Sequence, residues 1–247
     1  MQQDARAAQV TQQGGLVPPV PPPPIAPAPV QTQANVTVGD IIPFGRFDWR
    51  VLDVQDGKAL IITDWVIFGS EFTPSGFEVV TWETSDVREG LNSWFLSFFD
   101  TSELARIALT YVVNNNNPWD WTWGGGHNRT SGGYNTWDRI FLLSIDEVLQ
   151  HFGDSGMVAR GATMGENVRG ANAPTWPEWG IYSFGIHDQF SDNRIAIDDR
   201  DWASQWRLRS PGSTPYFAAH VRMDGLLNLH GWHDGGLGVR PALWLYL

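Results

Sequence analysis

Two segments decide the fold: Trp206-Arg207-Leu208-Arg209-Ser210-Pro211-Gly212, and the closing segment Gly238-Val239-Arg240-Pro241-Ala242-Leu243-Trp244-Leu245-Tyr246-Leu247. In the closing segment the leucines alternate with Ala242, Trp244 and Tyr246, which is the two-residue period of a strand. A strand this apolar would fray and aggregate if it were left unpaired. Pro241 has no N–H to give to a ladder and is tolerated only at an edge-like start. We therefore expect the closing strand to be held between other strands.

The composition is that of one good-sized domain with a tail. The 247 residues include 42% hydrophobic residues, which is ample for a core. The 16 basic residues against 27 acidic ones give a net charge of −11, which argues against a nucleic-acid partner because phosphates would be repelled. The absence of cysteine excludes disulfides, thiolate metal sites and cysteine nucleophiles. The apolar runs fall far short of the roughly 20 residues that a membrane span requires, so we expect no membrane insertion.

Residues 1–35 are predicted to be a Pro-rich disordered tail or linker, and residues 36–247 a single domain. The segment 18–29 in particular favours an extended polyproline II conformation. Because the tail lacks periodic apolar residues, its removal is expected to leave the melting temperature nearly unchanged. Residues 1–30 lack the basic start and apolar stretch of a secretory signal. An extracellular or cell-surface location nevertheless suits the binding role considered below.

Local signals predict strands and short helices within the domain. Asp56-Gly57 lies between two β-rich runs and is a strong two-residue hairpin signal, and Asp224-Gly225 predicts a second hairpin. Apolar residues at three- and four-residue spacing predict an amphipathic helix over residues 83–99. Shorter elements are predicted at 102–108 (a helix capped by Ser102), 109–113 (a strand), 139–145 (a strand), 146–152 (a helix) and 217–223 (a strand whose inward residues include Met223).

Two irregular segments, 114–137 and 174–182, are rich in aromatic residues. The first is a long Asn- and Gly-rich loop, and loops of this length in compact domains are usually functional or disordered. Indole rings stack on the C–H faces of sugars, while Asp, Asn and His at the rim bind the hydroxyl groups. The alternative is structural, because irregular folds also use Trp to fill the interior of loops. The candidate ligand-binding residues are Trp119, Asp120, Trp121, Trp123, His127, Asn128, Arg129, Trp176 and Trp179.

No motif in the sequence requires a cofactor, and two clusters are weighed as metal sites. One is an acidic run that offers oxygen ligands to calcium or else forms a solvated surface, comprising Asp188, Asp192, Asn193, Asp198, Asp199 and Asp201. The other is His230, His233 and Asp234, which offer zinc ligands or else are ordinary surface residues. The pair Asp198-Asp199 does not predict a two-carboxylate glycosidase, because adjacent residues on a strand point apart.

The two opening segments resemble a family of bacterial domains of unknown function with a Trp-Leu-Arg-Ser-Pro-Gly motif and a terminal Gly-Val-Arg-Pro-Ala-Leu-Trp motif. Further matches fall in the order that this family shows, so the resemblance covers about residues 36–247: Phe44-Gly45, Trp49-Arg50-Val51-Leu52, Trp82 with Ser85 and Arg88, Leu91-Asn92, the segment 140–144 and Asp224-Gly225. Arg209 and Arg240 belong to the two motifs and are surrounded in sequence by apolar residues. We therefore expect them to have a structural role, paired with buried carboxylates or carbonyls.

The same ending resembles the Gly-Phe-Arg close of C-type-lectin-like domains, including formylglycine-generating enzymes. This resemblance implies an α+β fold of the C-type-lectin-like kind, with a small antiparallel sheet, paired termini, two or three short helices and long irregular loops. It carries no catalysis over, because the chemistry of those enzymes uses cysteines and this chain has none.

The favoured hypothesis is a non-enzymatic module that binds or displays a glycan or protein ligand through its Trp-rich loops. The alternatives are an uncharacterised enzyme that acts on glycans and a structural domain of a bacterial surface assembly. An open aromatic surface would favour binding, whereas two facing carboxylates or a three-ligand metal site would favour an enzyme. Packed aromatic loops would favour the structural domain.

Overall fold

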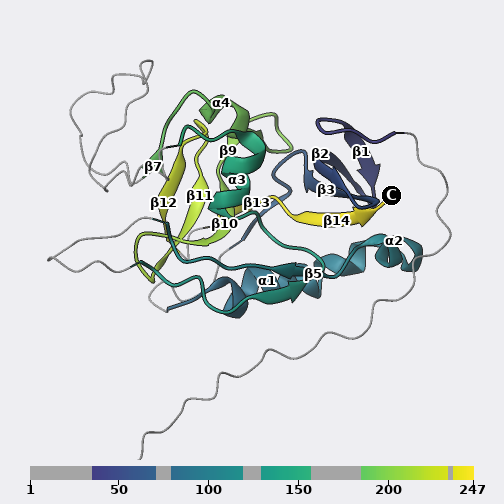
Figure 1. Ribbon diagram of the computed structural model, residues 1–247, viewed down its shortest axis with the longest axis horizontal. Coiled ribbons are helices and arrows are strands. Elements are labelled where there is room, and N and C mark those ends of the chain that lie inside the picture. The colour runs from purple at the N-terminus through teal and green to yellow at the C-terminus, as the bar shows by residue number, and fades with distance from the viewer. Residues whose placement is uncertain (1–34, 71–78, 119–128, 157–184, 233–235) are drawn as a thin grey trace, which may run out of the picture.

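The computed structural model describes residues 35–70, 79–118, 129–156, 185–232 and 236–247. These residues form a mixed α+β fold with a few short helices and several small sheets, as the sequence predicts at this level. In Figure 1 a six-stranded sheet lies at one end of the molecule and a four-stranded sheet at the other, with α1 and α2 beneath them. None of the described helices is long and apolar enough to cross a membrane.

The four-stranded sheet is antiparallel and has the order β1-β2-β3-β14. Its strands are β1 (Ile41–Phe44), β2 (Phe47–Gln55), β3 (Lys58–Thr63) and β14 (Ala242–Tyr246). The hairpin predicted at Asp56-Gly57 is confirmed as the β2–β3 turn, where φ is 50° at Asp56 and 70° at Gly57. Positive φ at both positions gives the turn a twist that matches its strands, which is why an Asp-Gly pair is favoured there.

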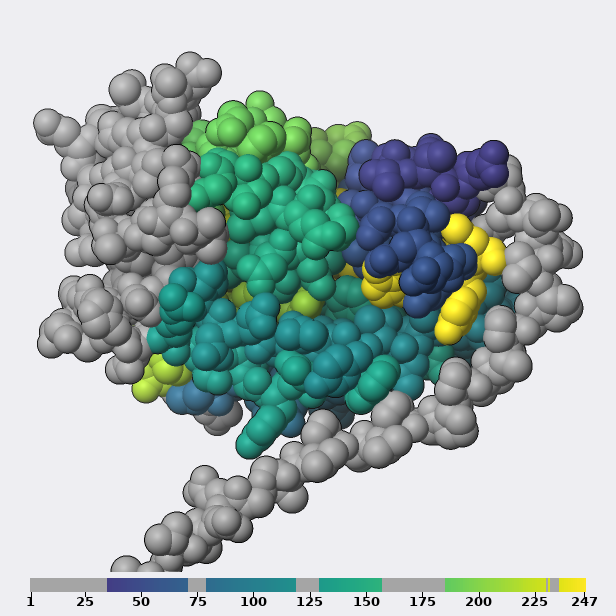
Figure 2. Space-filling view, viewed as in Figure 1, coloured from purple at the N-terminus to yellow at the C-terminus, as the bar shows by residue number. Residues whose placement is uncertain are grey.

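The closing strand β14 lies against β3 on one side, in register from Ala242 opposite Ile62 to Tyr246 opposite Lys58. On its other side it makes single bridges, because Leu245 pairs with Ile107 and Ala242 with Phe141. The prediction that this strand lies between other strands therefore holds on one side only, because β14 is the edge strand of its sheet and two single bridges cover its other side. Pro241 precedes the first paired residue and offers only its carbonyl, which accepts from Thr63 N at 3.0 Å. Figure 2 shows the yellow surface of the chain end directly against the blue surface of the opening hairpin.

The six-stranded sheet has the order β4-β13-β10-β11-β12-β7 and contains one parallel pair, β10 with β13. Its strands are β4 (Phe68–Ser70), β13 (Leu237–Val239), β10 (Trp206–Pro211), β11 (Phe217–Val221), β12 (Leu227–Trp232) and β7 (Gly185–Ile186). The predicted second hairpin is the β11–β12 pair. The inward placement of Met223 is wrong, because β11 ends at Val221 and Met223 is exposed in the turn that follows.

The helix predicted over residues 83–99 is interrupted. It consists of the 3-10 turn η1 (Trp82–Thr84), the helix α1 (Asp86–Asn92) capped by Ser85, and the 3-10 turn η2 (Phe95–Phe98). The Asn92 amide donates to Ile140 O at 2.8 Å and accepts from Arg139 N at 2.9 Å, and the next residue, Ser93, leaves the helical region. A contact 48 residues away therefore ends the helix, and local periodicity does not report it.

The remaining elements are short. Asp100, rather than Ser102, caps α2 (Thr101–Arg106). The Asp100 carboxylate accepts from Glu103 N, and the Glu103 carboxylate accepts from Asp100 N. Ser144 caps α3 (Ile145–Phe152), which packs on β10. Two further strand pairs and one helical turn complete the described residues: β5 (Thr110–Val112) with β6 (Thr136–Asp138), β8 (Ala196–Ile197) with β9 (Ala203–Ser204), and α4 (Ser191–Arg194).

Both sheets contribute to one hydrophobic core. Trp49 of β2, Trp82 of η1 and Trp206 of β10 are completely buried in it. Other tryptophans in the described residues face solvent, among them Trp65, Trp94, Trp137 and Trp202. The described tryptophans therefore include both core residues and surface residues.

Candidate functional site

The structure describes the root of the predicted 114–137 loop. Of the candidate ligand-binding residues, Arg129 lies in this root and is exposed. The others lie outside the described residues and remain predictions: Trp119, Asp120, Trp121, Trp123, His127, Asn128, Trp176 and Trp179.

Asparagine side chains hold the two arms of the root together. Asn114 N donates to Asn135 Oδ1 at 2.8 Å, and Asn114 Nδ2 donates to Tyr134 O at 2.7 Å. Further along, Asn117 N donates to Thr130 O at 2.8 Å, and Asn116 Oδ1 accepts from Gly132 N at 3.1 Å. Asparagine suits this work because its amide donates and accepts at once and pairs readily with backbone. The Asn-rich composition, read from sequence as a loop signal, therefore builds a fixed stem.

The arms approach each other so closely that one position requires glycine. A Cβ atom at Gly132 would lie 2.4 Å from the carbonyl oxygens of both Asn114 and Asn115. Because these are backbone atoms tied into the stem, they have little freedom to move aside.

Gly132→Ala is expected to destabilise the fold by about 1–3 kcal/mol, since overpacking of this kind forces backbone shifts. Chemical denaturation of the wild type and the variant measures this difference in the free energy of unfolding. The matched control is Gly90→Ala in the middle of α1, where a Cβ meets nothing within 4 Å and Ala is the better helix former. The control should be neutral or slightly stabilising, and an equal effect of both changes would contradict a tight stem.

The segment 206–212 fixes this root to the core. Asn117 Nδ2 donates to Pro211 O and Gly212 O, both at 2.9 Å, and Arg209 Nη2 donates to Val113 O at 3.2 Å. The Ser210 hydroxyl accepts from Ile145 N at 3.0 Å, at the start of α3. The Arg-Ser-Pro-Gly part of the first deciding segment thus positions the loop root and the helix beside it.

Arg209 is buried and paired with Glu147 of α3. Its Nη2 donates to Glu147 Oε1 at 2.9 Å, its Nη1 donates to the other carboxylate oxygen, and Nη1 also donates to Leu142 O at 2.7 Å. Burial alone would raise the pKa of Glu147, but the charge and hydrogen bonds of Arg209, with the Ser144 N–H and His151, outweigh it and lower that pKa. The carboxylate is therefore held ionised.

Arg240 is buried at the start of the closing strand. Its Nε and Nη2 donate to Thr63 O at 3.0 and 2.8 Å, and Nη2 also donates to Asp64 O at 3.1 Å. The guanidinium lies over the Trp206 ring, 5.0 Å from its centroid. Burial lowers the pKa of Arg240 to about 10, partly opposed by the charge of Asp64 and reinforced by that of Arg50. Both deciding segments therefore meet at the Arg240–Trp206 contact.

An aromatic face lies on the β5–β6 pair beside the loop root. We use this name for Tyr111 and Trp137 of the strand pair together with Tyr134, which lies in the loop root two residues before β6. Tyr111 and Trp137 are directly opposite each other in register, and their ring centroids are 5.0 Å apart. Their exposed fractions are 44% and 37%, and that of Tyr134 is 70%. Asn135 Nδ2 donates to the Tyr111 hydroxyl at 3.0 Å, which ties the face to the asparagine stem.

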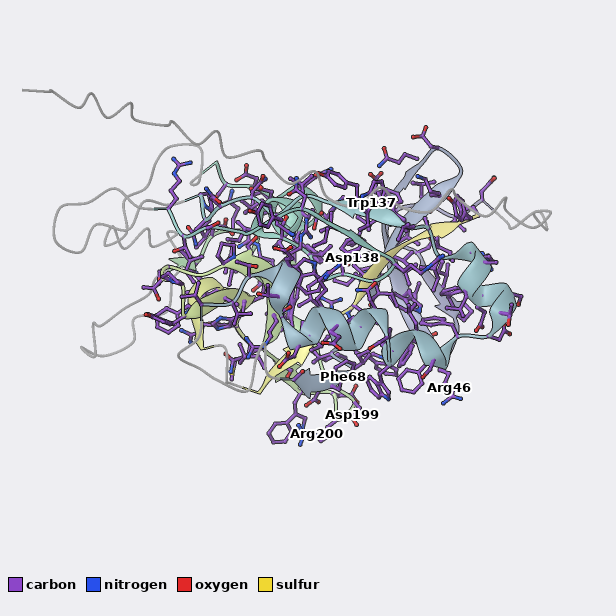
Figure 3. The ribbon with its side chains drawn as sticks, turned by 90° about the horizontal axis from the view of Figure 1, so that it is seen from below. Arg46, Phe68, Trp137, Asp138, Asp199 and Arg200 are labelled. Atoms are coloured by element: carbon purple, nitrogen blue, oxygen red, sulfur yellow. The ribbon has the colours of Figure 1, made fainter. Side chains whose placement is uncertain are left out.

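Directly beneath Trp137, Asp138 is a buried anchor (Figure 3). Its Oδ2 accepts from Trp82 Nε1 at 2.9 Å and from the Thr136 hydroxyl at 2.6 Å, and its Oδ1 accepts from Arg88 Nε at 2.7 Å. Trp82 and Arg88, which the sequence singles out, therefore converge on one carboxylate and hold β6 against η1 and α1.

The acidic run does not form a metal site in the described residues. Asp188 is buried and pairs with Arg194 at 3.0 Å, while Asp198 pairs with Arg200 at 2.7 Å. No group of three or more His, Cys, Asp or Glu that suits a metal occurs in the part of the chain that the structure describes. His233 and Asp234 of the zinc candidate lie outside that part.

The chain matches a known family of protein domains over most of its length. The family model described as Domain of unknown function (DUF6273) matches residues 56–247. The chain belongs to this family. No curated protein and no solved structure matches it. The DUF6273 match begins in the β2–β3 turn, so it includes Trp82, Arg88, Arg209 and Arg240. The strands β1 and β2 lie before it, although Trp49 and Val51 of β2 belong to the same core.

Acidification is expected to weaken this DUF6273 domain through His151 of α3. Burial lowers the pKa of His151 below its usual 6.5, and the charges of Glu147 and Asp53 with the backbone of Leu52 oppose this only in part. The unfolded chain therefore binds the proton at higher pH than the folded one. The stability that His151 contributes is present above pH 6.5 and is lost as the pH falls through the lower folded-state value.

Thermal melting at two pH values tests the predicted role of His151. Between about pH 7.5 and about pH 5.5, the wild type should lose more of its melting temperature than His151→Gln, which has no proton to bind. Equal losses in the two proteins would assign the acid sensitivity to other groups.

Proposed function

We propose that this chain is a non-enzymatic binding or display module, and that its ligand surface is the aromatic face of Tyr111, Tyr134 and Trp137. The observation that carries the proposal is the exposed Tyr111–Trp137 pair, with ring centroids 5.0 Å apart on a fixed pair of strands. Exposed aromatic rings are costly to keep in water, and a pair held in place offers a ligand a surface without an ordering cost.

The chemistry of the face suits a sugar. Aromatic faces stack against sugar C–H surfaces, while the amide of Asn135 and the hydroxyl of Tyr111, which bond to each other, supply hydrogen-bonding groups beside them. The net charge of −11 disfavours polyanionic ligands. A neutral glycan is therefore the ligand class that we propose, with a protein ligand as the alternative.

The fixed stem supports binding as well. Each arm is held by asparagine bonds, and the stem is tied to the core through Asn117 and Arg209. Sites that are held before the ligand arrives lose less free energy on binding. A C-type-lectin-like architecture, in which long loops present the ligand, is the finer fold assignment that we attach to this proposal.

The carboxylates that pair with arginines favour binding over glycan hydrolysis. Asp138, Glu147 and Asp188 each accept a hydrogen bond from an arginine. For Asp188 burial acts to raise the pKa, but the hydrogen bonds from Arg194 and Ser155, the Arg194 charge and the Phe190 N–H lower it overall, as Arg209 does for Glu147. A glycosidase needs a carboxyl group whose pKa is raised so that it donates a proton. These three carboxylates have anchoring roles instead.

The test is a glycan and protein array probed with the full chain, followed by Trp137→Ala. The variant should lose about 30-fold in affinity for the ligand found, which corresponds to ~2 kcal/mol for a central aromatic contact. Its free energy of unfolding should fall by less than about 1 kcal/mol, because the side chain is partly exposed.

The matched control is Trp202→Ala, since Trp202 is 73% exposed on the β8–β9 hairpin, outside the aromatic face. It should leave affinity unchanged. If Trp137→Ala destabilises the chain by several kcal/mol and leaves binding intact, the face is structural and the proposal fails.

A further inference from the structure

A second aromatic surface lies apart from the proposed ligand face. It comprises Phe47, Phe68, Trp94 and Phe98 with Arg46, and we call it the η2 face. Trp94 is 54% exposed, and its ring meets Phe68 and Phe98 at 5.7 and 4.8 Å between centroids. Both contacts are close to perpendicular, at 80° and 74°. Figure 3 shows Phe68 and Arg46 on the opposite side of the domain from Trp137.

The face is rigid and continuous. Phe98 also packs on Phe47 at 6.2 Å, and Arg46 lies over the Phe98 ring at 5.5 Å from its centroid. Phe95, which is fully buried, contacts Phe47, Phe68 and Phe98 from below. The exposed indole of Trp94 is nearly perpendicular to the Phe68 and Phe98 rings and offers apolar surface together with a ring N–H. This is the chemistry by which aromatic surfaces hold polyproline II segments, whose rings pack on the aromatics and whose carbonyls accept from indole N–H.

The chain itself contains such a segment. Residues 16–30 read Leu-Val-Pro-Pro-Val-Pro-Pro-Pro-Pro-Ile-Ala-Pro-Ala-Pro-Val and carry no charge. They precede Val36, which packs on the core and so fixes where the domain begins. From there, residues 30–35 span about 20 Å when extended, and the twelve residues 18–29 span about 37 Å as polyproline II. Arg46 follows Val36 by ten residues, so the two residues lie at most about 35 Å apart, within the range that residues 18–35 can span. The segment therefore reaches the η2 face.

We propose that residues 18–29 dock on the η2 face of the same chain. The contact is apolar, so it should be insensitive to salt. A segment tethered this close has a high effective concentration, so docking needs little intrinsic affinity and adds little to global stability. The inference does not depend on the proposed ligand face.

The docking can be tested by spin labelling. The chain contains no cysteine, so labels attach only at cysteines that are introduced. In the full chain, Ala26→Cys is combined with Ser97→Cys, an exposed position beside Trp94, and distances between the labels are measured by pulsed electron paramagnetic resonance. A narrow short-distance population is expected. It should remain at high salt and when the labelled chain is diluted into unlabelled chain.

Trp94→Ala in the labelled chain should reduce the docked-to-free ratio about fivefold, the loss expected for an aromatic contact at an interface. Tyr216→Ala is the matched control, because Tyr216 is 42% exposed at the start of β11, three strands from β4. It should leave the distances unchanged. A broad distribution in the parent chain, or no response to Trp94→Ala, overturns the proposal. Loss of the short distance on dilution overturns it too, because the occupant is then a second copy.

Discussion

Deletion of residues 243–247 is expected to abolish folding. Leu243 and Leu245 are completely buried, and β14 supplies the edge that β3 pairs with over five residues. Losing each buried leucine side chain costs about 2–5 kcal/mol, against a total stability of about 5–15 kcal/mol for a domain. The deletion also exposes one side of β3 to other chains.

The loss is larger than that of one edge strand, because β14 also holds the end of α2 and the segment that follows it. Trp244 O accepts from Ala108 N at 2.8 Å, and Tyr246 O accepts from Arg106 Nε and Nη2, both at 3.2 Å. These contacts tie the start of β5, and hence the aromatic face, to the four-stranded sheet. Without them the end of α2 and the residues before β5 lose their hydrogen bonds to this sheet.

Circular dichroism and thermal melting of the truncated chain provide the measurement. The control is removal of Leu247 alone, which is half-buried and contributes one backbone bond to Gly57 O. That variant should fold and melt cooperatively. A soluble chain that lacks 243–247 and still melts cooperatively would show that β14 is dispensable.

The parts of the fold that sequence predicts are those set by neighbouring residues. The Asp56-Gly57 turn needs positive φ at two positions, and the alternation in 239–247 needs only a strand with two covered faces. The start of α3 is likewise local, since Ser144 and Glu147 form a capping box three residues apart. These signals act over a few residues, so they are legible without the tertiary structure.

The parts that sequence misses depend on distant contacts. The break after Asn92 is made by its bonds to residues 139 and 140, and the Asp138 anchor gathers Trp82 and Arg88 from more than 45 residues away. The β10–β13 pair is parallel, so no tight turn joins its two strands and no local sequence signal predicts their pairing. In each case the chain brings together residues whose spacing carries no period.

The candidate site divides in the same way. The Asn and Gly content of the segment 114–137 predicts a loop, yet its ends form a stem and its last residues pair as β6. The strand predicted over 109–113 includes Tyr111, but its contact with Trp137 exists only once β5 and β6 are in register. By residue type, the alternation of Thr136, Trp137 and Asp138 predicts an inward Trp137. The structure instead buries Thr136 and Asp138, because Asp138 accepts hydrogen bonds from Trp82 and Arg88.

Arg209→Met is expected to destabilise the chain by about 3 kcal/mol, the lower end of the range for removing one partner of a buried ion pair, because the Glu147 side chain is partly exposed. The change leaves the half-buried Glu147 without its cation and removes donors to Leu142 O and Val113 O. Because Val113 precedes the asparagine stem, the variant should also weaken any ligand binding at the aromatic face. Chemical denaturation, with ligand affinity measured on the folded fraction, provides the two readouts.

Two controls separate the buried pair from a general effect of losing an arginine. Arg50→Met removes the partly exposed pair with Asp64 and should cost about 1 kcal/mol or less. The double variant Arg209→Met with Glu147→Leu should recover part of the loss, since no uncompensated charge then remains buried. The wild type should also lose stability as the pH falls below the usual 4.5 of Glu147, because its folded-state pKa is lowered, whereas the double variant should lack that contribution. If Arg209→Met costs no more than Arg50→Met, the pair does not hold the root of the site.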